Sequence, residues 1–214
     1  MIGRLAAWLL LVAALAASNY AVRFTEGRPP KDVLYQWSTV AGSLFEFGLI
    51  FVVVLLIARD EWQLLAWRRP ASWTRAAGIG VTVLIGVYLV GALLSPLLHP
   101  GQEQGLAPQS WEPSRAAAFV ANALVVCAFA PLVEESTFRG VGFGLFASRW
   151  GPGVAVVATA VLFGLAHGLV EALPLLVAFG LGLAWLRLRV NSTVPGMILH
   201  GTFNMLALVL SLTT

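Results

Sequence analysis

Residues 131–140 read PLVEESTFRG, and this stretch places three ionisable side chains inside a very apolar region of the chain. Glu134 and Glu135 follow an apolar run that starts at Ala116, and Arg139 comes one helical turn after Glu135. An ionised side chain at membrane depth costs about 2.5–3.5 kcal/mol on insertion scales, so such residues are retained for a function or a specific pairing. In a helix, Glu135 and Arg139 share a face and can pair, whereas Glu134 points about a quarter-turn away. The spacing therefore predicts one carboxylate held by the arginine and one that is free to act as a base.

The composition of the chain indicates an integral membrane protein. Of its 214 residues, 59% are hydrophobic and 11% are charged, and the mean hydropathy is +0.86. A soluble domain carries about 25% charged residues. The formal net charge of +3 is accounted for by basic residues in loops, so we expect a lipid bilayer as the surroundings and no nucleic-acid partner. The single cysteine, Cys127, excludes an intrachain disulfide.

The apolar segments predict an all-α, polytopic transmembrane bundle of about seven spans, or eight if a poorly marked one is counted. A helix needs about 20 apolar residues to cross a bilayer. Pro131 and the glycines that follow it predict a kink or break in the fourth segment. We expect a single integral membrane domain, residues 1–214. The predicted spans are Leu5–Val22, Val40–Ala58, Ala76–Leu98, a fourth stretch from Arg115 through Glu134 that resumes to Trp150, Val154–Gly168, Ala172–Leu188 and Val194–Leu212.

The N-terminal segment has two interpretations. Arg4, the apolar run from Leu5 to Leu15 and the small residues 16–18 fit a cleaved signal peptide. The run from Leu5 to Val22 is also long enough to span the membrane. We favour a retained first helix because the rest of the chain is polytopic, and the distribution of loop arginines favours a cytoplasmic N-terminus.

Three apolar segments carry polar groups that could form one site. The first holds Glu134, Glu135 and Arg139, the second ends in His167, and the third holds His200 and Asn204, which are four residues apart. Each group alone has a purely structural explanation: an interhelical hydrogen bond for a histidine, packing for an asparagine, a buried ion pair for the acid and arginine. All three in the second half of one small chain favour a polar cavity among the C-terminal helices.

The combined set contains what hydrolysis of an amide requires. Glu134 could take a proton from water, and His167 could share or relay it. His200 and Asn204 supply N–H donors that could stabilise an oxyanion. No serine stands beside a base, and Cys127 has no motif around it, so water is the favoured nucleophile.

Zinc is the competing mechanism. Glu134, His167 and His200 could bind the ion and leave a position open for water. The sequence holds no His-Glu-x-x-His motif, and Arg139 close by would oppose a cation. Hydrolysis without a cofactor is therefore favoured, with zinc as the alternative.

The three motifs together resemble the signatures of a known family. Glu-Glu-x-x-x-Arg at 134–139, Phe-x-x-x-His at 163–167 and His-x-x-x-Asn at 200–204 are similar, in order and rough spacing, to those of the CPBP family of CaaX prenyl proteases and bacteriocin-processing enzymes, also called Abi proteins. The resemblance spans about residues 115–212, which we expect to be the catalytic helices, and leaves 1–114 without an assigned role.

The resemblance implies an intramembrane endopeptidase with a water-accessible cavity. Glu134 and His167 would activate water, Glu135 and Arg139 would order the site, and His200 and Asn204 would form the oxyanion hole. The substrate would be a membrane-anchored peptide or protein. The Ala-, Leu-, Val- and Arg-rich composition is typical of a high-GC bacterium, so the bacterial inner membrane is the expected location.

Two functions of other classes remain open. The first is a non-catalytic immunity or scaffold protein that keeps the motifs for packing or for binding a partner. The second is a small transporter that uses Glu46, Glu134 and His167 as a proton relay.

The predicted topology sets one geometric condition. In a simple alternating count of spans, His167 lies toward the outer end of its helix and Glu134 lies past the middle of its own. The two meet only if the Glu134 helix is long, tilted or broken. We expect them to lie within about one water molecule of each other.

Overall fold

The computed structural model describes residues 2–98, 103 and 111–212, and within these ranges every regular element is a helix. The all-α prediction is confirmed. The short 3-10 turns are η1 (Val33–Tyr35), η2 (Trp62–Leu65) and η3 (Pro113–Arg115), and the longer elements are α1 (Ile2–Glu26), α2 (Trp37–Ala58), α3 (Trp73–Leu94), α5 (Ala116–Leu124), η4 (Val125–Phe129), α6 (Ala130–Glu135), η5 (Ser136–Gly142), α7 (Phe143–Trp150), α8 (Pro152–Ala166), α9 (Leu173–Val190) and α10 (Val194–Ser211).

Six helical segments of the described chain are long and apolar enough to cross a membrane. They match six of the predicted spans, and the protein is a multi-pass membrane protein. The first span is longer than predicted, because α1 continues to Glu26 and therefore includes Arg23, which the sequence placed in a loop. The predicted span Val154–Gly168 corresponds to α8, which has only 15 residues. A helix of this length rises about 22 Å, less than the roughly 30 Å of a hydrocarbon core.

The fourth segment is one helix of 38 residues, Pro113–Trp150, and not two helices separated by a break. The expected irregularity takes the form of two π-helical stretches, η4 and η5, which flank the short α6. Ser136 and Thr137 at the start of η5 donate their hydroxyls to the carbonyls of Leu132 and Val133, at 2.6 Å and 2.7 Å. Such bonds compete with the backbone ladder. The helix absorbs the distortion by widening its turns, so the chain stays continuous through the site.

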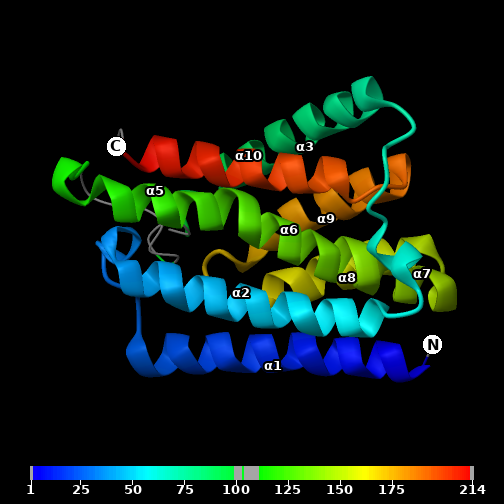
Figure 1. Cartoon of the computed structure of the whole chain (residues 1–214). Helices are drawn as coiled ribbons and strands as arrows, with labels where there is room; N and C mark the ends of the chain where they lie inside the picture. Colours follow the sequence, from blue (N-terminus) through cyan, green and yellow to red (C-terminus); the bar gives the residue numbers. More distant parts are fainter. Residues whose placement is uncertain (1, 99–102, 104–110, 213–214) are drawn as a thin grey trace.

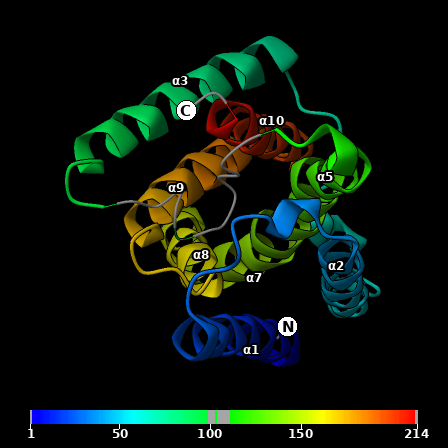
Figure 2. The same cartoon turned by 90° about the vertical axis from the view of Figure 1, so that its left-hand side faces the viewer.

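This long helix lies in the middle of the bundle (Figure 1). Seen along the bundle, α1 and α2 lie on one side of it, α8 and α9 on another, and α10 beside α5 (Figure 2). Helix α3 lies at the outer edge and packs against α9 and α10. The helices on both sides therefore face the segment that carries Glu134 and Glu135.

The turn between α7 and α8 brings the second motif back toward the first. Gly151 adopts φ +86°, a conformation that glycine takes without a steric penalty, and Pro152 occupies the first turn of α8, where its missing N–H is not needed. Because α8 is short, it ends at Ala166 before it has crossed the bundle. His167, which is the C-cap of this helix, therefore lies at the depth of α6 and not at the far surface.

Candidate active site

Glu134 faces both histidines of the C-terminal helices. Its Oε2 lies 3.9 Å from Nε2 of His167 and 3.7 Å from Nε2 of His200. This oxygen is buried and has no hydrogen-bond partner among the described protein atoms. The separations are too long for direct hydrogen bonds, and a water molecule that lies to the side of these atoms, in the cavity, would contact them. The expected proximity of acid and imidazole is met, because the long α5–α7 helix carries Glu134 to the depth at which the short α8 ends.

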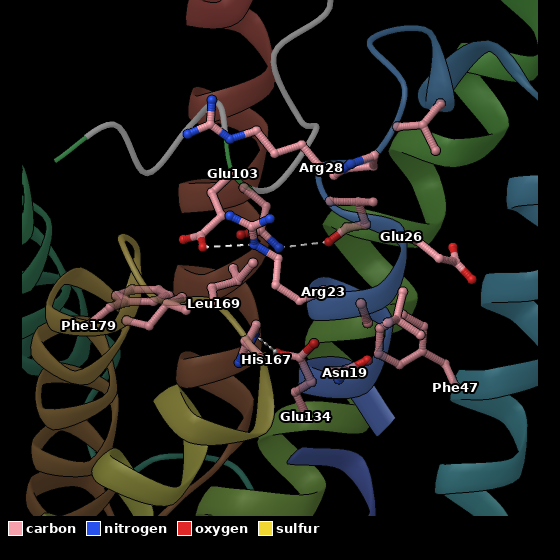
Figure 3. A pocket seen from close by; sticks show the side chains of 18 of the residues that line it. Asn19, Arg23, Glu26, Arg28, Phe47, Glu103, Glu134, His167, Leu169 and Phe179 are labelled. Carbon is pink, nitrogen blue, oxygen red and sulfur yellow. Dashed lines mark hydrogen bonds and ion pairs between the residues drawn. The ribbon is translucent and has the colours of Figure 1, made fainter. Parts of the chain in front are cut away.

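The His167 side chain faces the Glu134 carboxylate (Figure 3) and is oriented by its own helix. Its Nδ1 lies 2.7 Å from the carbonyl oxygen of Phe163. A carbonyl oxygen can only accept, so Nδ1 carries the proton and donates. In the neutral ring Nε2 is then an acceptor aimed at the Glu134 carboxylate. Two acceptors 3.9 Å apart do not bond to each other, and a water molecule beside them can donate one proton to each.

Glu135 is held as the sequence predicts, by the arginine one turn later. Its Oε1 lies 3.2 Å from Nη1 of Arg139 and 3.1 Å from Nδ1 of His200. Arg139 is fully buried, donates from Nη2 to the carbonyl oxygen of Gly180 at 3.1 Å, and stacks over the Phe163 ring at 4.3 Å. The ion pair therefore links α6 to α9 and α10 and fixes which nitrogen of His200 faces Glu134.

Asn204 stabilises the irregular part of the long helix. Its Nδ2 donates to the carbonyl oxygen of Val126, at 2.8 Å. In a π-helical turn this carbonyl would be paired with the N–H five residues on, which is Pro131, and proline has no N–H. One amide proton of Asn204 thus satisfies the orphaned carbonyl, and the second remains for a ligand. Asn204 also lines the cavity described next.

Two cavities meet at Glu134. The larger, about 730 Å³, is also lined by His167, His200, Asn204 and several residues of the N-terminal half. The smaller, about 240 Å³, lies on the side of α1 and α2, and Glu46 is among the residues that line it together with Glu134 and His167. The Glu134 side chain is therefore accessible from two cavities, a larger one with room for a peptide and a smaller one beside Glu46.

The residues near Glu134 do not form a metal-binding cluster. Among the residues that the structure describes, no group of three or more His, Cys, Asp and Glu side chains is placed to hold a metal ion. Glu135, which could complete a zinc site with Glu134 and the histidines, is occupied by Arg139 and His200. The donors of the described residues therefore do not fit the zinc alternative.

The structure brings all six residues of the three motifs into one region and adds others that the sequence did not indicate. Asn19, Arg23 and Glu103 line the larger cavity although they lie outside the three motifs. The sequence places both Arg23 and Glu103 in loops between predicted spans. No local pattern distinguishes them, because their partners lie about 70–150 residues away in the chain.

Gly168 is required where α8 ends beside α1. It adopts φ +65°, and a Cβ at this position would lie 2.5 Å from the carbonyl carbon of Asn19. We expect Gly168→Ala to displace the adjoining His167 and to lower kcat/KM by at least about tenfold, the equivalent of about 1.4 kcal/mol. Gly151→Ala is the matched control, since Gly151 also has a positive φ but no atom within 4 Å of an added Cβ.

Both alanine variants carry a backbone penalty of about 1–3 kcal/mol, measured as a decrease in the free energy of unfolding in detergent. Only Gly168→Ala should also lower the activity of the folded fraction. Equal activity of the two folded variants would show that the contact between Gly168 and α1 does not position His167.

Long apolar helices around a cavity that contains carboxylates and imidazoles define a multi-pass membrane protein with an acid–base site of the kind found in enzymes. Residues 116–206 match the family model described as Type II CAAX prenyl endopeptidase Rce1-like, and they form a domain of this family. The family resemblance read from the three motifs is thus confirmed. The description of this family model names an endopeptidase, and the match is limited to residues 116–206.

The chain has no significant match among curated proteins or solved structures. Residues before Ala116 lie outside the family match.

Proposed function

We propose that the protein is an intramembrane endopeptidase that hydrolyses a peptide bond of a membrane-associated peptide or protein with water activated by Glu134 and His167. The observation that carries this proposal is the unpartnered Oε2 of Glu134, which lies 3.9 Å and 3.7 Å from Nε2 of His167 and His200 at the wall of the larger cavity. A water molecule there has its protons directed to Glu134 and His167. Its oxygen lone pair is left for the carbonyl carbon of a peptide bond in the larger cavity.

In the first step the water oxygen bonds to the carbonyl carbon and Glu134 takes the proton. The carbonyl π electrons move to the oxygen, which becomes an oxyanion. In the second step the tetrahedral intermediate collapses, the C–N bond breaks, and Glu134 returns the proton to the departing amine. Glu134 thus acts as base and then as acid, and the products are a carboxylic acid and an amine.

His200 and Asn204 would stabilise the oxyanion. Asn204 has one amide proton left after its bond to Val126. In His200, Nδ1 donates to the Glu135 carboxylate, so donation from Nε2 requires a ring that carries both protons. Arg139 acts on the reaction indirectly, because it holds Glu135 in place.

We also propose one membrane-embedded unit of residues 1–214, in which 115–212 carry the chemistry. The topology is about seven crossings, with α8 as a short one that brings His167 to mid-depth. The composition supports the cytoplasmic membrane of a bacterium as the location. Trimming of CaaX proteins is then a less suitable task than the processing or release of other membrane-anchored peptides.

Replacement of either histidine tests this function. We expect His167→Ala and His200→Ala each to lower kcat/KM for a membrane-anchored peptide by about 10²-fold or more, since one loses the partner of the base and the other an oxyanion donor. Asn122→Ala is the control: Asn122 is a buried amide in the same long helix, but it bonds Leu34 and Gln36 and does not line the cavity.

Three results would favour other functions. Unchanged biological activity in both folded histidine variants would support the non-catalytic scaffold. Activity lost with a chelator and restored by zinc would replace the metal-free mechanism. A proton-coupled flux in liposomes that depends on Glu46 would support the transporter.

A further inference from the structure

The carboxylate of Glu103 lies in a pocket of hydrogen-bond donors in the wall of the larger cavity (Figure 3). Its Oε1 accepts from Nε of Arg23 at 3.1 Å and from the backbone N–H of Val170 at 2.9 Å. Its Oε2 accepts from the backbone N–H of Glu171 at 2.8 Å and of Ala172 at 3.0 Å. The side chain of Glu103 is fully buried. Four donors thus converge on one carboxylate, and every hydrogen bond that the described residues make to it comes from a donor.

The donors come from parts of the fold that hold them in place without Glu103. Arg23 is on the last turn of α1, a helix of 25 residues. The three backbone N–H groups belong to consecutive residues immediately before α9, where such groups have no partner within the helix and the helix dipole favours an anion. Successive N–H groups of this kind form a concave anion-binding surface. We call Arg23 and the N–H groups of residues 170–172 the carboxylate pocket.

The carboxylate form is the one that this pocket favours. Burial raises the pKa of the Glu103 carboxyl, but the hydrogen bonds from Val170, Ala172 and Arg23 outweigh it and hold the pKa below its usual range. The pocket therefore binds an anion at neutral pH. Its chemistry depends on the carboxylate group alone and not on the rest of the glutamate.

The carboxylate pocket belongs to the same cavity as the water-activating residues. Arg23, Glu103, Glu134, His167 and His200 all line the space of about 730 Å³ in which the peptide would be cleaved. A peptide that occupies this space lies beside the pocket. A carboxylate of the peptide can replace that of Glu103 in the carboxylate pocket and still accept from all four donors. An uncharged group would leave at least one of these four buried donors without an acceptor.

We propose that the carboxylate pocket is a specificity subsite, which Glu103 fills in the free enzyme and a carboxylate of the peptide substrate fills during cleavage. This inference rests on the proposed endopeptidase function. It predicts that the substrate presents a carboxylate near the cleaved bond, either its free C-terminus or an acidic side chain.

The test uses one N-terminally acylated, fluorescent peptide of Ala, Leu and Val in three forms: with a free C-terminal carboxylate, with a C-terminal amide, and with the amide plus one internal Glu. The full-length protein in nanodiscs is assayed as wild type, Glu103→Ala, Arg23→Gln and Lys31→Gln. Lys31 is an exposed cation that does not line the cavity, so its variant controls for net charge.

We expect the wild-type protein to have a KM at least about tenfold lower for one carboxylate form than for the amide, with a similar kcat. Glu103→Ala should lower that KM further, because the competing side chain is gone. Arg23→Gln should abolish the difference, and Lys31→Gln should leave it unchanged. Whichever carboxylate form is preferred identifies the source, C-terminus or side chain.

A binding measurement separates this inference from the proposed function. The fluorescence anisotropy of each of the three peptides is measured as it binds to the Glu134→Gln variant. Carboxylate-dependent binding without cleavage by the wild type would overturn the endopeptidase and leave the subsite. Cleavage with the same KM for all three peptides would overturn the subsite alone and leave Glu103 as a structural link. If Glu103→Ala does not fold, Glu103→Gln retains one acceptor oxygen, weakens the competing contact and must lower the KM for the preferred carboxylate form.

Discussion

Glu134→Gln should lower kcat/KM by at least about 10³-fold while the protein stays folded and still binds peptide. A general base contributes about 10²–10⁴-fold, and here the same carboxylate takes the proton from water and returns it to the amine. The amide of glutamine fills the same volume but accepts no proton. Oε2 of Glu134 is buried without a partner, so the substitution breaks no hydrogen bond. The measurement is kcat and KM on a membrane-anchored peptide, together with the free energy of unfolding.

Glu46→Gln is the matched comparison, because Glu46 is another acid in an apolar helix and lines the smaller cavity with Glu134. We expect a change of less than about tenfold, equivalent to about 1.4 kcal/mol. A loss as large as that of Glu134→Gln would indicate that the two acids act together, as in the proton relay of a transporter. A Glu134→Gln variant that cleaves at the wild-type rate would exclude Glu134 as the base.

Arg139→Met should have the largest effect on stability, about 3–5 kcal/mol lower free energy of unfolding. Removal of one partner from a buried ion pair leaves the other charge without compensation. Arg139 and Glu135 are both fully buried, and the arginine also bonds Gly180 and stacks on Phe163. The variant should lose activity as well, since His200 depends on Glu135 for its orientation. Steric trapping in bicelles measures the stability.

Two comparisons test the cause of this loss. The double variant with Glu135→Gln removes the uncompensated charge, so it should be more stable than the sum of the two single changes predicts, by about 0.5–3 kcal/mol. Arg115→Met removes the ion pairs of Arg115 with Asp32 and Glu112, which are all substantially exposed, and should lower stability much less than Arg139→Met. Strict additivity of the two buried changes would contradict the proposed pairing.

The Glu135–Arg139 contact shows how much of the site could be predicted from sequence. Four-residue spacing within one helix implies a shared face, and the pair is present at 3.2 Å. The same rule left Glu134 free, as found. The kink or break expected around Pro131 takes the form of π-helical turns in one continuous helix, which accommodates the proline and the two hydroxyls. These turns leave the carbonyl of Val126 without a helical partner, and Asn204, 78 residues further along the chain, donates to it.

The site residues of the N-terminal half could not be predicted from the sequence. Asn19 donates to the carbonyl oxygen of Ala166, and Arg23 to Glu103, so α1 contacts both the end of α8 and the carboxylate pocket. Neither residue belongs to a motif: Asn19 lies near the end of the first predicted span and Arg23 in the loop that follows it. Their importance follows only from the position of α1 beside α8 (Figure 2).

The amino-acid sequence by itself determined the membrane class, the helical fold, the approximate spans and the six polar residues of the three motifs. These depend on hydropathy and on spacing within single helices, which are local properties. The tertiary structure decided which imidazole nitrogen faces Glu134, how the helix passes Pro131, and that Arg23 and Glu103 line the cavity. These are contacts between helices that are distant in sequence. Their geometry is set by how side chains from separate helices pack together, and local periodicity does not contain that information.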